Sequence, residues 1–298
     1  DQKETLQIQP DENTAVQWIP VEQLPEICKE PHMLPVYEKV IHRMRRWKAM
    51  QEQALLQTAQ PLLAWYPLHA RDLPWRHTQE PYRIWLSEIM LQQTRVEAVR
   101  NYYARFLETF PDIAALAAAE QDQVNKCWEG LGYYSRAANL RKAAQTIQEQ
   151  YGGVFPRTWE EVRGLAGVGD YTAGAVCSIC YGLPTPAVDG NVLRVAARVM
   201  NHFCEIDRPE QKAAVTALLR QVYLDNPEHC GTLTQAFMEI GATVCVPNGQ
   251  PHCEACPLSE LCLGRQYCDA LRLPQRTAKK ARRQEQYTVF VLQCDGKF

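Results

Sequence analysis

The sequence predicts a mainly α-helical protein, and three observations along its 298 residues support that class. Apolar side chains from Trp85 to Tyr103 recur at three- and four-residue steps, as on one helix face. Two glycines, Gly167 and Gly169, allow a tight hairpin between two further helices. A run of four cysteines then lies near the end of the otherwise helical chain.

The first of these segments, P-Y-R-I-W-L-S-E-I-M-L-Q-Q-T-R-V, carries a carboxylate, Glu88, beside its apolar stripe. An arbitrary glutamate on a helix is most often a solvated surface group. Partial desolvation by Trp85, Ile89 and Met90 would instead raise the pKa of Glu88. A raised pKa suits a general acid that works near neutral pH.

The hairpin segment, L-A-G-V-G-D-Y-T-A-G-A-V, covers residues 165–176. Backbone N–H groups at the start of its second helix would suit a phosphate oxygen, because these donors are unpaired and the positive end of the helix dipole also favours an anion there. A G-x-G between helices is a weak signal alone, and a plain turn is the alternative. Two carboxylates strengthen it: Glu88 upstream, and Asp189 in A-V-D-G-N-V-L-R-V downstream. No nucleotide-hydrolase loop of the form G-x-x-x-x-G-K-[ST] competes.

The cysteine run is C-V-P-N-G-Q-P-H-C-E-A-C-P-L-S-E-L-C. Proline and glycine residues between the cysteines supply the chain reversals that let four thiolates converge. Such a ligand set suits tetrahedral zinc or a cubic iron–sulfur cluster. Only one C-x-x-C is present and the other gaps are wide and unequal, which favours the cluster. Its ligands would be Cys245, Cys253, Cys256 and Cys262.

Taken in order, these segments resemble the adenine DNA glycosylases of the helix-hairpin-helix superfamily. The resemblance runs from about Leu55 to about Leu271 and includes L-P-W-R, S-E-I-M-L-Q-Q-T, G-L-G-Y-Y-S-R-A, G-V-G-D-Y-T-A-G, V-D-G-N-V and the cysteine run. It implies a monomeric, monofunctional enzyme that flips adenine out of double-stranded DNA. The enzyme would hydrolyse the N-glycosidic bond of adenine mispaired with 8-oxoguanine or guanine, and would carry a [4Fe-4S] cluster.

The resemblance also implies roles for single residues. Glu88 would protonate the departing adenine, and Asp189 would stabilise or trap the sugar cation, as the two carboxylates of retaining glycosidases do. Tyr171 and Asn191 would orient Asp189 and the sugar. Glu239 is a candidate to support the site, with an ordinary helix glutamate as the alternative.

Other residues are expected to contact DNA. The wedge that fills the gap left by the flipped base would be formed by a glutamine and a tyrosine. The alternative for the tyrosine is that it packs in the hydrophobic core. These DNA-contact candidates are Gln92, Gln93 and Tyr133 at the wedge, Gly167, Val168 and Gly169 in the hairpin, and Arg136.

Two other functions remain open at this stage. An endonuclease III-like glycosylase and lyase carries a lysine just before the T-A of the hairpin helix, where this chain has Tyr171. Schiff-base chemistry would therefore lack its nucleophile. A catalytically silent DNA-binding iron–sulfur protein should have lost one acid, yet Glu88 and Asp189 are both present.

Composition agrees with a globular enzyme of a reducing compartment. Apolar residues make up 46% of the chain, with no stretch of membrane-spanning length and no signal-peptide pattern. Of the twelve cysteines, Cys127, Cys177 and Cys180 lie in apolar helical sequence, where cysteine acts as a small hydrophobic residue. We expect the nucleoid-containing cytoplasm of a bacterium, or the nucleus or mitochondrion of a eukaryote.

The net charge of −2 is unevenly distributed. Residues 1–30 hold two basic and seven acidic residues, so the remainder carries +3. One basic concentration comprises Arg136, Arg141 and Lys142, and a second runs from Arg272 to Arg283; each is either a solvated face or a track for phosphates. Asp170 stands in the hairpin where the family usually has a basic residue, at an electrostatic cost of about 1 kcal/mol.

The resemblance predicts a division of the chain into segments. A helical barrel lobe with the hairpin covers 76–182, and a cluster-bearing lobe combines 51–75 with 183–271. A basic linker covers 272–285, and 286–298 resembles the first strand of a Nudix-like domain. Residues 1–46 resemble the closing strand and last helix of such a domain, with an unrelated extension as the alternative. The acidic Nudix box is absent, so no Nudix catalysis is expected.

Overall fold

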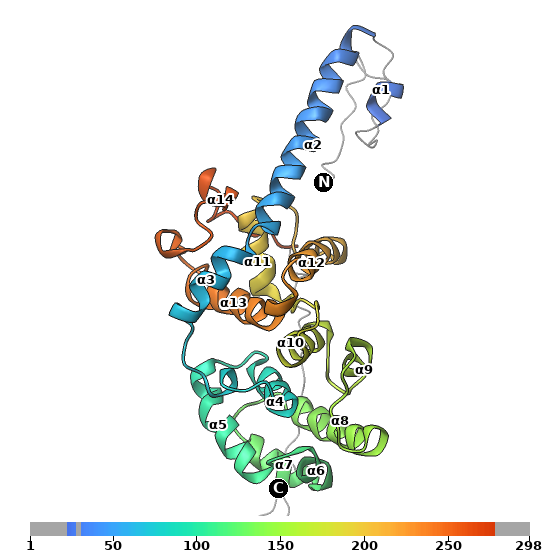
Figure 1. Ribbon diagram of the computed structural model, residues 1–298, viewed down its shortest axis with the longest axis vertical. Coiled ribbons are helices and arrows are strands. Elements are labelled where there is room, and N and C mark those ends of the chain that lie inside the picture. The colour runs from blue at the N-terminus through green and yellow to red at the C-terminus, as the bar shows by residue number, and fades with distance from the viewer. Residues whose placement is uncertain (1–22, 28–30, 278–298) are drawn as a thin grey trace, which may run out of the picture.

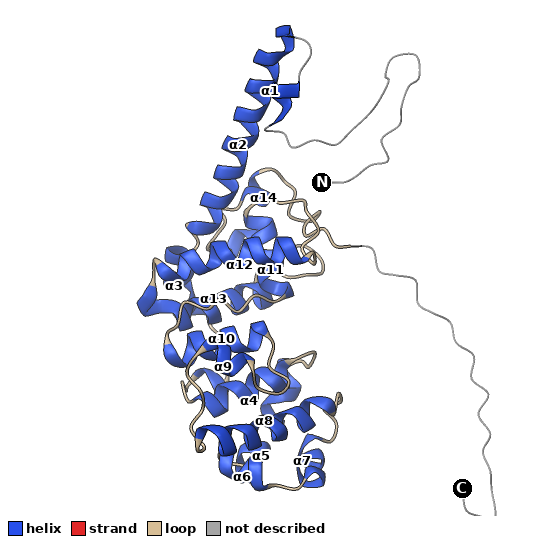
Figure 2. Cartoon of the chain, turned by 90° about the vertical axis from the view of Figure 1, so that its right-hand side faces the viewer, coloured by secondary structure: helices blue, strands red, loops and turns tan. Residues whose placement is uncertain are grey.

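The computed structural model describes residues 23–27 and 31–277, which form two helical lobes and one long projecting helix (Figure 1). Figure 2 shows only helices and loops in this part of the chain, and its β-type pairing is limited to one bridge between Glu205 and Gln275. The predicted mainly α-helical class is confirmed. The strand-like segments expected near both ends lie outside the described residues. None of the helices in the described ranges has the length and apolar character needed to cross a membrane.

The helices follow one another with short connections. Their bounds are α1 Leu24–Ile27, α2 Leu34–Leu56, α3 Ala59–His69, α4 Pro81–Leu91, α5 Val96–Thr109, α6 Ile113–Ala118, α7 Gln121–Trp128, α8 Ser135–Tyr151, α9 Trp159–Arg163, α10 Asp170–Tyr181, α11 Gly190–Val199, α12 Pro209–Leu224, α13 Cys230–Thr243 and α14 Leu263–Gln266.

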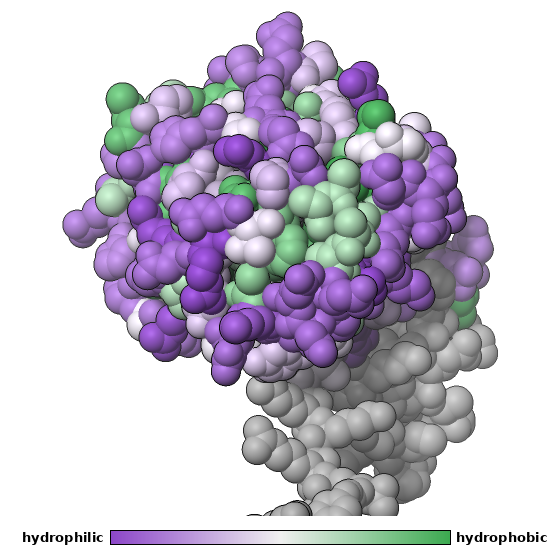
Figure 3. Space-filling view, turned by 90° about the horizontal axis from the view of Figure 1, so that it is seen from below, coloured by the Kyte–Doolittle hydropathy of each residue, from purple (hydrophilic) through white to green (hydrophobic). Residues whose placement is uncertain are grey.

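The lower lobe in Figure 1 is built from α4 to α10 around one hydrophobic core. Aromatic rings fill its centre: Trp85 meets Phe155 edge-on at 5.6 Å between ring centroids, and Phe106 meets Trp128 at 6.0 Å. Burying each such side chain contributes about 1.5–3 kcal/mol, so this core holds α4 firmly in place. Seen from below, the outer end of this lobe is mostly polar, with smaller apolar areas between (Figure 3).

A second core joins α3, α11, α12 and α13 with the inner end of α2 and the cysteine loop. Helix α13 packs against α3 and α11 of this lobe and against α10 of the other, so it links the two. The chain therefore passes from the upper lobe to the lower after α3 and returns before α11. Both crossings run beside the interface between the lobes.

Helix α2 projects from the upper lobe as one continuous helix (Figures 1 and 2). Its inner end is fixed by the Gln51 amide, which donates to the Asn201 carbonyl at 3.1 Å, and by an edge contact of Trp47 with Tyr267. The segment boundary expected between residues 46 and 51 does not interrupt this helix.

The single helix face expected from Trp85 to Tyr103 is wrong, because α4 ends at Leu91 and α5 begins at Val96. Between them, Gln93 adopts a left-handed backbone conformation with φ of 59°. The apolar spacing persists across the break because both helices direct their apolar residues into the same core.

The chain after the cysteine loop stays attached to the upper lobe as far as it is described. Arg198 donates to the Leu273 carbonyl at 3.0 Å, and the Ile206 N–H donates to the Gln275 carbonyl at 3.1 Å. The Thr277 N–H then donates to Asp207 at 3.0 Å. The first six residues of the expected linker thus pack on the lobe, and the rest lies outside the described residues.

Candidate active site

The catalytic acid expected in the lower lobe, Glu88, lies on α4 and is only 5% exposed. The helix starts at Pro81 because the Glu80 side chain accepts the first free N–H groups. Burial raises the pKa of Glu88 to about 7, which the negative charge of Asp189 assists and a hydrogen bond with Tyr171 opposes. Glu88 is therefore largely protonated below neutral pH and can donate a proton.

The second carboxylate, Asp189, caps the N-terminus of α11. One oxygen accepts from the backbone N–H groups of Asn191 and Val192, both at 2.9 Å, and the other from the Asn191 amide at 2.8 Å. Arg194 in turn donates to the Asn191 side-chain oxygen at 3.0 Å, which fixes the direction of the amide. The carboxylate of Asp189 is thus held in one orientation at the lobe interface, with Asn191 bonded to it as expected.

Tyr171 lies in the first turn of α10, and a side-chain hydrogen bond links its hydroxyl to Glu88. Its expected role in orienting Asp189 and the sugar stays a prediction. Burial raises the pKa of Tyr171 well above its usual value, and both carboxylates raise it further. The phenol therefore stays neutral and acts as a hydrogen-bonding group beside the acid.

These side chains meet in one cavity of about 200 Å³ between the lobes. An apolar cavity of about 150 Å³ accepts a benzene ring, so this volume is on the scale of a heteroaromatic base. Its apolar walls include Leu73, Trp75 and Met238. Its polar lining comprises Ser87, Glu88, Tyr171, Asp189, Asn191, Arg71, Arg76, Thr94 and Gln235.

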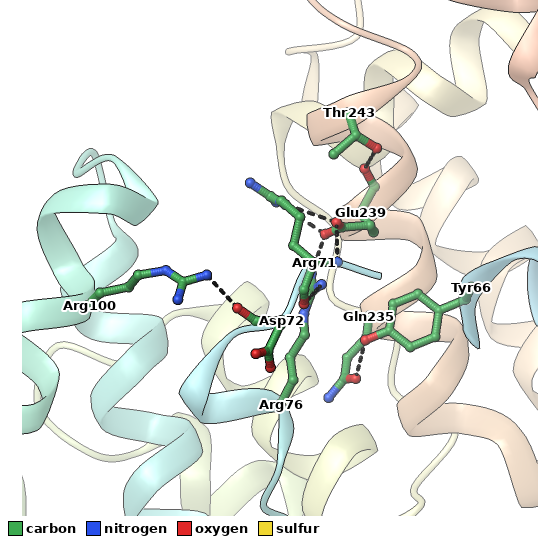
Figure 4. Close-up of polar contacts among 8 residues, drawn as sticks. All are labelled: Tyr66, Arg71, Asp72, Arg76, Arg100, Gln235, Glu239 and Thr243. Atoms are coloured by element: carbon green, nitrogen blue, oxygen red, sulfur yellow. Dashed lines mark hydrogen bonds and ion pairs between the residues drawn. The ribbon is translucent and has the colours of Figure 1, made fainter. Parts of the chain in front are cut away.

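Arg71 and Arg76 line one wall of the cavity, and both are bonded to the fully buried Glu239 of α13 (Figure 4). Arg71 donates to the Glu239 carboxylate from its backbone N–H at 3.0 Å and from its guanidinium at 2.8 and 3.1 Å, and Arg76 donates as well. Burial alone would raise the pKa of Glu239, but these hydrogen bonds lower it to about 2. Beside them, the Tyr66 hydroxyl donates to Gln235 at 2.6 Å.

The sequence indicated Glu239 only by resemblance, and it did not indicate Arg71, Arg76 or Gln235. A usable signal was present in R-D-L-P-W-R, where two arginines flank a short turn between helices. Their partner lies more than 160 positions along the chain, so local spacing could not reveal the cluster.

The hairpin between α9 and α10 has the expected form. Gly167 has φ of 74°, and an added Cβ would lie 2.7 Å from the Asn139 Cβ, so only glycine fits there. Val168 is buried in the lower core and anchors the turn, and Gly169 is the N-cap of α10. The first N–H groups of α10 have no partner within the helix, which leaves them available to an anion.

The acid expected to disfavour phosphate binding at the hairpin, Asp170, is paired. Arg163 of α9 donates to its carboxylate at 2.5 Å and also to the Val168 carbonyl at 3.1 Å. The hydrogen bond from Arg163 lowers the pKa of Asp170. The arginine both closes the hairpin and offsets the negative charge that the sequence places there.

The wedge candidates lie on two turns, and the turn with Gln92 and Gln93 borders the cavity through Leu91 and Thr94. Tyr133 is 63% exposed with φ of 48°, which excludes the core-aromatic alternative. Gln93 is exposed as well, while Gln92 is half-buried and donates to the Thr172 hydroxyl at 3.4 Å. Two non-glycine residues in left-handed conformations on neighbouring turns indicate backbone strain of the kind found at functional sites.

Arg136 is not exposed, which contradicts the expectation that it contacts DNA directly. Its guanidinium is buried and both terminal nitrogens donate to protein oxygens. Arg141, in the same basic concentration, donates to the Ala119 carbonyl. That concentration is therefore mostly structural, because G-Y-Y-S-R places Arg136 on the inner side of α8.

The four cysteines of the run line one cavity in the upper lobe, together with Arg198. Arg198 donates to the Cys245 sulfur at 3.3 Å, and its carbonyl accepts from the Cys262 thiol at 3.3 Å. Burial raises the pKa of Cys256 to about 12 and that of Cys262 to about 11. Deprotonating these thiols therefore requires a bound cationic centre.

The cysteines surround a space instead of meeting at one point. Within residues 23–27 and 31–277, no three His, Cys, Asp or Glu side chains are grouped as ligands of a single metal ion. Cys268, the nearby cysteine that could confuse the ligand assignment, is exposed and does not line this cavity.

Comparison with known proteins agrees with this geometry. Residues 86–221 match the HhH-GPD superfamily of base excision DNA repair proteins. The chain is 44% identical to the adenine DNA glycosylase of Homo sapiens, covering 69% of this chain and 39% of that protein. It is 33% identical to the adenine DNA glycosylase of Buchnera aphidicola subsp. Acyrthosiphon pisum, covering 80% of this chain and 68% of that protein.

Solved structures share the fold. A thermostable thymine-DNA glycosylase matches with a TM-score of 0.64 at 26% identity, covering 74% of this chain and 99% of that chain. A non-covalent endonuclease III–DNA complex matches with a TM-score of 0.61 at 23% identity, covering 73% and 97%. The chain belongs to the adenine DNA glycosylase family of the HhH-GPD superfamily. It spans about two fifths of the length of the mammalian relatives that it matches.

Proposed function

We propose that the protein is a monofunctional adenine DNA glycosylase, which hydrolyses the N-glycosidic bond of adenine mispaired with 8-oxoguanine or guanine. The observation that carries the proposal is one base-sized cavity that holds two carboxylates in different environments. Glu88 is buried with a raised pKa, whereas Asp189 is held by three N–H donors. The relatives that it matches carry the name adenine DNA glycosylase.

The first step is proton transfer to the base. The neutral Glu88 carboxyl donates its proton to N7 of the flipped adenine, so that the leaving group departs as neutral adenine. The C1′–N9 bond breaks, its electron pair stays with the base, and the sugar becomes an oxocarbenium-like cation. Tyr171 holds the acid in position through its hydrogen bond to Glu88.

The second step completes hydrolysis at the sugar. The Asp189 carboxylate stabilises the cation electrostatically, or bonds to C1′ until water replaces it. Water adds its oxygen to C1′ and releases a proton, which the Glu88 carboxylate can accept. The products are free adenine and an abasic site.

The base would be recognised at the charged wall of the cavity. Arg71 and Arg76 line the cavity, so their guanidinium groups can donate hydrogen bonds to the ring nitrogens of a purine, while the fully buried Glu239 carboxylate holds both arginines in place. Trp75 and Leu73 would supply apolar contact to the ring faces. A site with paired buried charges rejects a base that cannot match them.

The DNA duplex would be held by two elements. Gly167, Val168 and Gly169 would present backbone N–H groups to a phosphate. Gln92, Gln93 and Tyr133 would enter the space left by the extruded base. We propose that a monomer suffices, with 76–182 as the barrel lobe and 51–75 plus 183–271 as the cluster lobe.

The remaining segments and the location are also proposals. We propose that 272–285 links the catalytic core to Nudix-like sequence at 286–298, and that 1–46 is an N-terminal segment of Nudix-like origin. The enzyme would act at DNA, in the nucleoid of a bacterium or in the nucleus or mitochondrion of a eukaryote.

We propose that the cysteine cavity holds a [4Fe-4S] cluster through Cys245, Cys253, Cys256 and Cys262. Four soft sulfur donors surround one space, and Arg198 donates a hydrogen bond to one of them, the Cys245 sulfur. The sulfur ligands of iron–sulfur clusters accept hydrogen bonds of this kind. A bound cluster would supply positive charge that keeps the thiolates deprotonated and cross-links a loop with few apolar residues. Its proposed role is structural.

The experiment that tests the proposed function uses a duplex with one adenine opposite 8-oxoguanine. The protein should release free adenine, and the strand should break only after alkali treatment. Breakage without alkali would support the lyase alternative, and duplex binding without any adenine release would support the silent alternative. Asp189→Asn should reduce release by roughly 100- to 1000-fold.

A further inference from the structure

Arg136 connects two segments that are separate in the sequence, residues 89–94 and the turn before α8. It lies in the first turn of α8 and is 8% exposed. Its Nη1 atom donates to the carbonyls of Ile89 at 3.0 Å, Met90 at 2.9 Å and Gln92 at 2.6 Å. Its Nη2 atom donates to the Thr94 hydroxyl at 3.2 Å and to the carbonyls of Leu131 at 3.1 Å and Gly132 at 3.3 Å.

The first group of bonds fixes the end of the helix that carries Glu88. The last carbonyls of α4 have no partner within the helix, and the Arg136 cation satisfies two of them where the helix dipole is negative. The bond to Gln92 continues into the turn before α5. That turn borders the catalytic cavity through Leu91 and Thr94.

The second group of bonds fixes the turn that presents Tyr133. The Leu131 and Gly132 carbonyls bond to the guanidinium, and the Tyr133 carbonyl accepts the Arg136 backbone N–H at 2.9 Å. The guanidinium carbon also lies 5.6 Å from the centre of the Tyr133 ring. Such a cation–π contact restrains the base of an otherwise exposed side chain.

We infer that Arg136 is a positioning residue that holds the Gln92 turn and the Tyr133 turn at a fixed separation, so that both wedge residues enter the duplex together. The inference rests on the proposed function. One planar guanidinium bridges both turns with bonds in fixed directions, whereas a lysine ammonium has only three donors at a single point. Base extrusion, and not proton transfer, is the step that depends on this bridge.

The test compares two duplexes in single-turnover assays with Arg136→Met. One places adenine opposite 8-oxoguanine, and the other places it opposite a base-free sugar, where less extrusion energy is needed. We expect adenine release by the variant to fall by roughly 100-fold on the first duplex and by less than tenfold on the second. Arg141→Met is the matched control, since its guanidinium lies on the same helix and bonds to Ala119 instead.

Other variants separate the possible outcomes. Glu88→Gln should show the same deficit on both duplexes, because chemistry is lost in each. An Arg136→Met deficit equal on the two duplexes, or no deficit on either, would overturn the inference. If this variant does not fold, Arg136→Lys replaces it, with the same dependence on substrate expected at smaller size.

A readout without catalysis keeps this inference distinct from the proposed function. A 2-aminopurine placed at the adenine position should fluoresce more strongly when the parent protein binds, because the base leaves the stack. The increase should be lost in Arg136→Met and retained in Arg141→Met. A retained increase in Arg136→Met contradicts the inference, whereas absence of adenine release by the parent protein contradicts the proposed function alone.

Discussion

At the scale of single residues, the site depends on two carboxylates that the fold treats differently. Glu88 is buried in the lower lobe among apolar side chains, and its pKa is raised to about 7. Asp189 caps a helix in the upper lobe and accepts three hydrogen bonds. Glu88 can hold a proton at neutral pH, whereas Asp189 is surrounded by hydrogen-bond donors. This difference suits the proposed roles of Glu88 as the acid and Asp189 as the cation-stabilising group.

The first prediction concerns the pH dependence of catalysis. Because Glu88 must be protonated to donate, the single-turnover rate should be nearly constant below pH 7 and fall roughly tenfold for each pH unit above it. Single-turnover rates between pH 5.5 and 9 measure this directly. A rate that stays constant to pH 9 would mean that another group supplies the proton.

The second prediction concerns stability. The pKa of Glu88 is higher in the folded chain than its ordinary value of 4.5. Its contribution to the free energy of unfolding is therefore fully present below pH 4.5 and is lost as pH rises through about 7. The amide of Glu88→Gln does not ionise, so the variant does not lose this stability as pH rises. The melting temperature of the variant minus that of the parent should therefore increase from pH 4.5 to 7 and then level off. A difference that is constant across this window would show that the carboxyl is not desolvated.

The third prediction concerns strand cleavage. Tyr171→Lys places an amine in the first turn of α10, beside both carboxylates, where it can attack C1′ and form a Schiff base. Borohydride should trap a covalent DNA complex with the variant and little with the parent. Efficient trapping with the parent would indicate a nucleophilic lysine elsewhere in the chain.

At the scale of elements, short turns set the positions of the functional groups. The hairpin turn needs Gly167 for its backbone conformation and for its contact with Asn139. The turns with Gln93 and Tyr133 use left-handed residues that are not glycine. Each turn is fixed by an arginine: Arg163 closes the hairpin, and Arg136 holds the other two.

The fourth prediction compares two left-handed glycines at the two ends of α10. Gly167→Ala should weaken duplex binding, because the new Cβ would lie 2.7 Å from the Asn139 Cβ and displace the hairpin. The new Cβ of Gly182→Ala would have no neighbour within 4 Å, so this variant should lose only the stability that the left-handed backbone costs a non-glycine residue, about 1–2 kcal/mol. Fluorescence anisotropy with a labelled duplex measures both. Equal affinities of the two variants for the duplex would contradict a contact between the hairpin and DNA.

Local motifs were readable from the sequence, and long-range pairings were not. The turn at Gly167 and Gly169 and the gathering of the cysteine run around one cavity could be predicted from spacing over fewer than twenty residues. The break after Leu91 was missed because apolar spacing continues through it. The buried position of Arg136 was missed because four of its six side-chain partners lie more than 40 residues away, and most of the partners are backbone carbonyls, which have no sequence signature.

At the scale of the whole molecule, the cavity exists because two separate cores meet there. The lower core positions Glu88 and the hairpin, and the upper core positions Asp189 and the cysteine loop. Helix α13 packs against elements of both and brings Glu239 to the interface. The two carboxylates could be proposed from the sequence, but their meeting depends on two crossings of the chain that only the fold shows.

The fifth prediction concerns the cysteine loop. Cys256→Ser should remove the iron and the brown colour, and should lower solubility, because the loop has few apolar residues to hold it without a cluster. Cys268→Ser is the matched control, since Cys268 is exposed and outside the cavity. Iron and sulfide analysis of anaerobically purified protein measures the difference. Full iron content in Cys256→Ser, or zinc in place of iron in the parent, would contradict the cluster assignment.

The most direct test of the central claim is the single-turnover release of adenine by Glu88→Gln and the parent on the same duplex, with adenine opposite 8-oxoguanine. The amide cannot deliver a proton, so release should fall by roughly 100- to 10,000-fold while duplex binding is retained. Release by the variant at the parental rate would contradict the assignment of Glu88 as the catalytic acid.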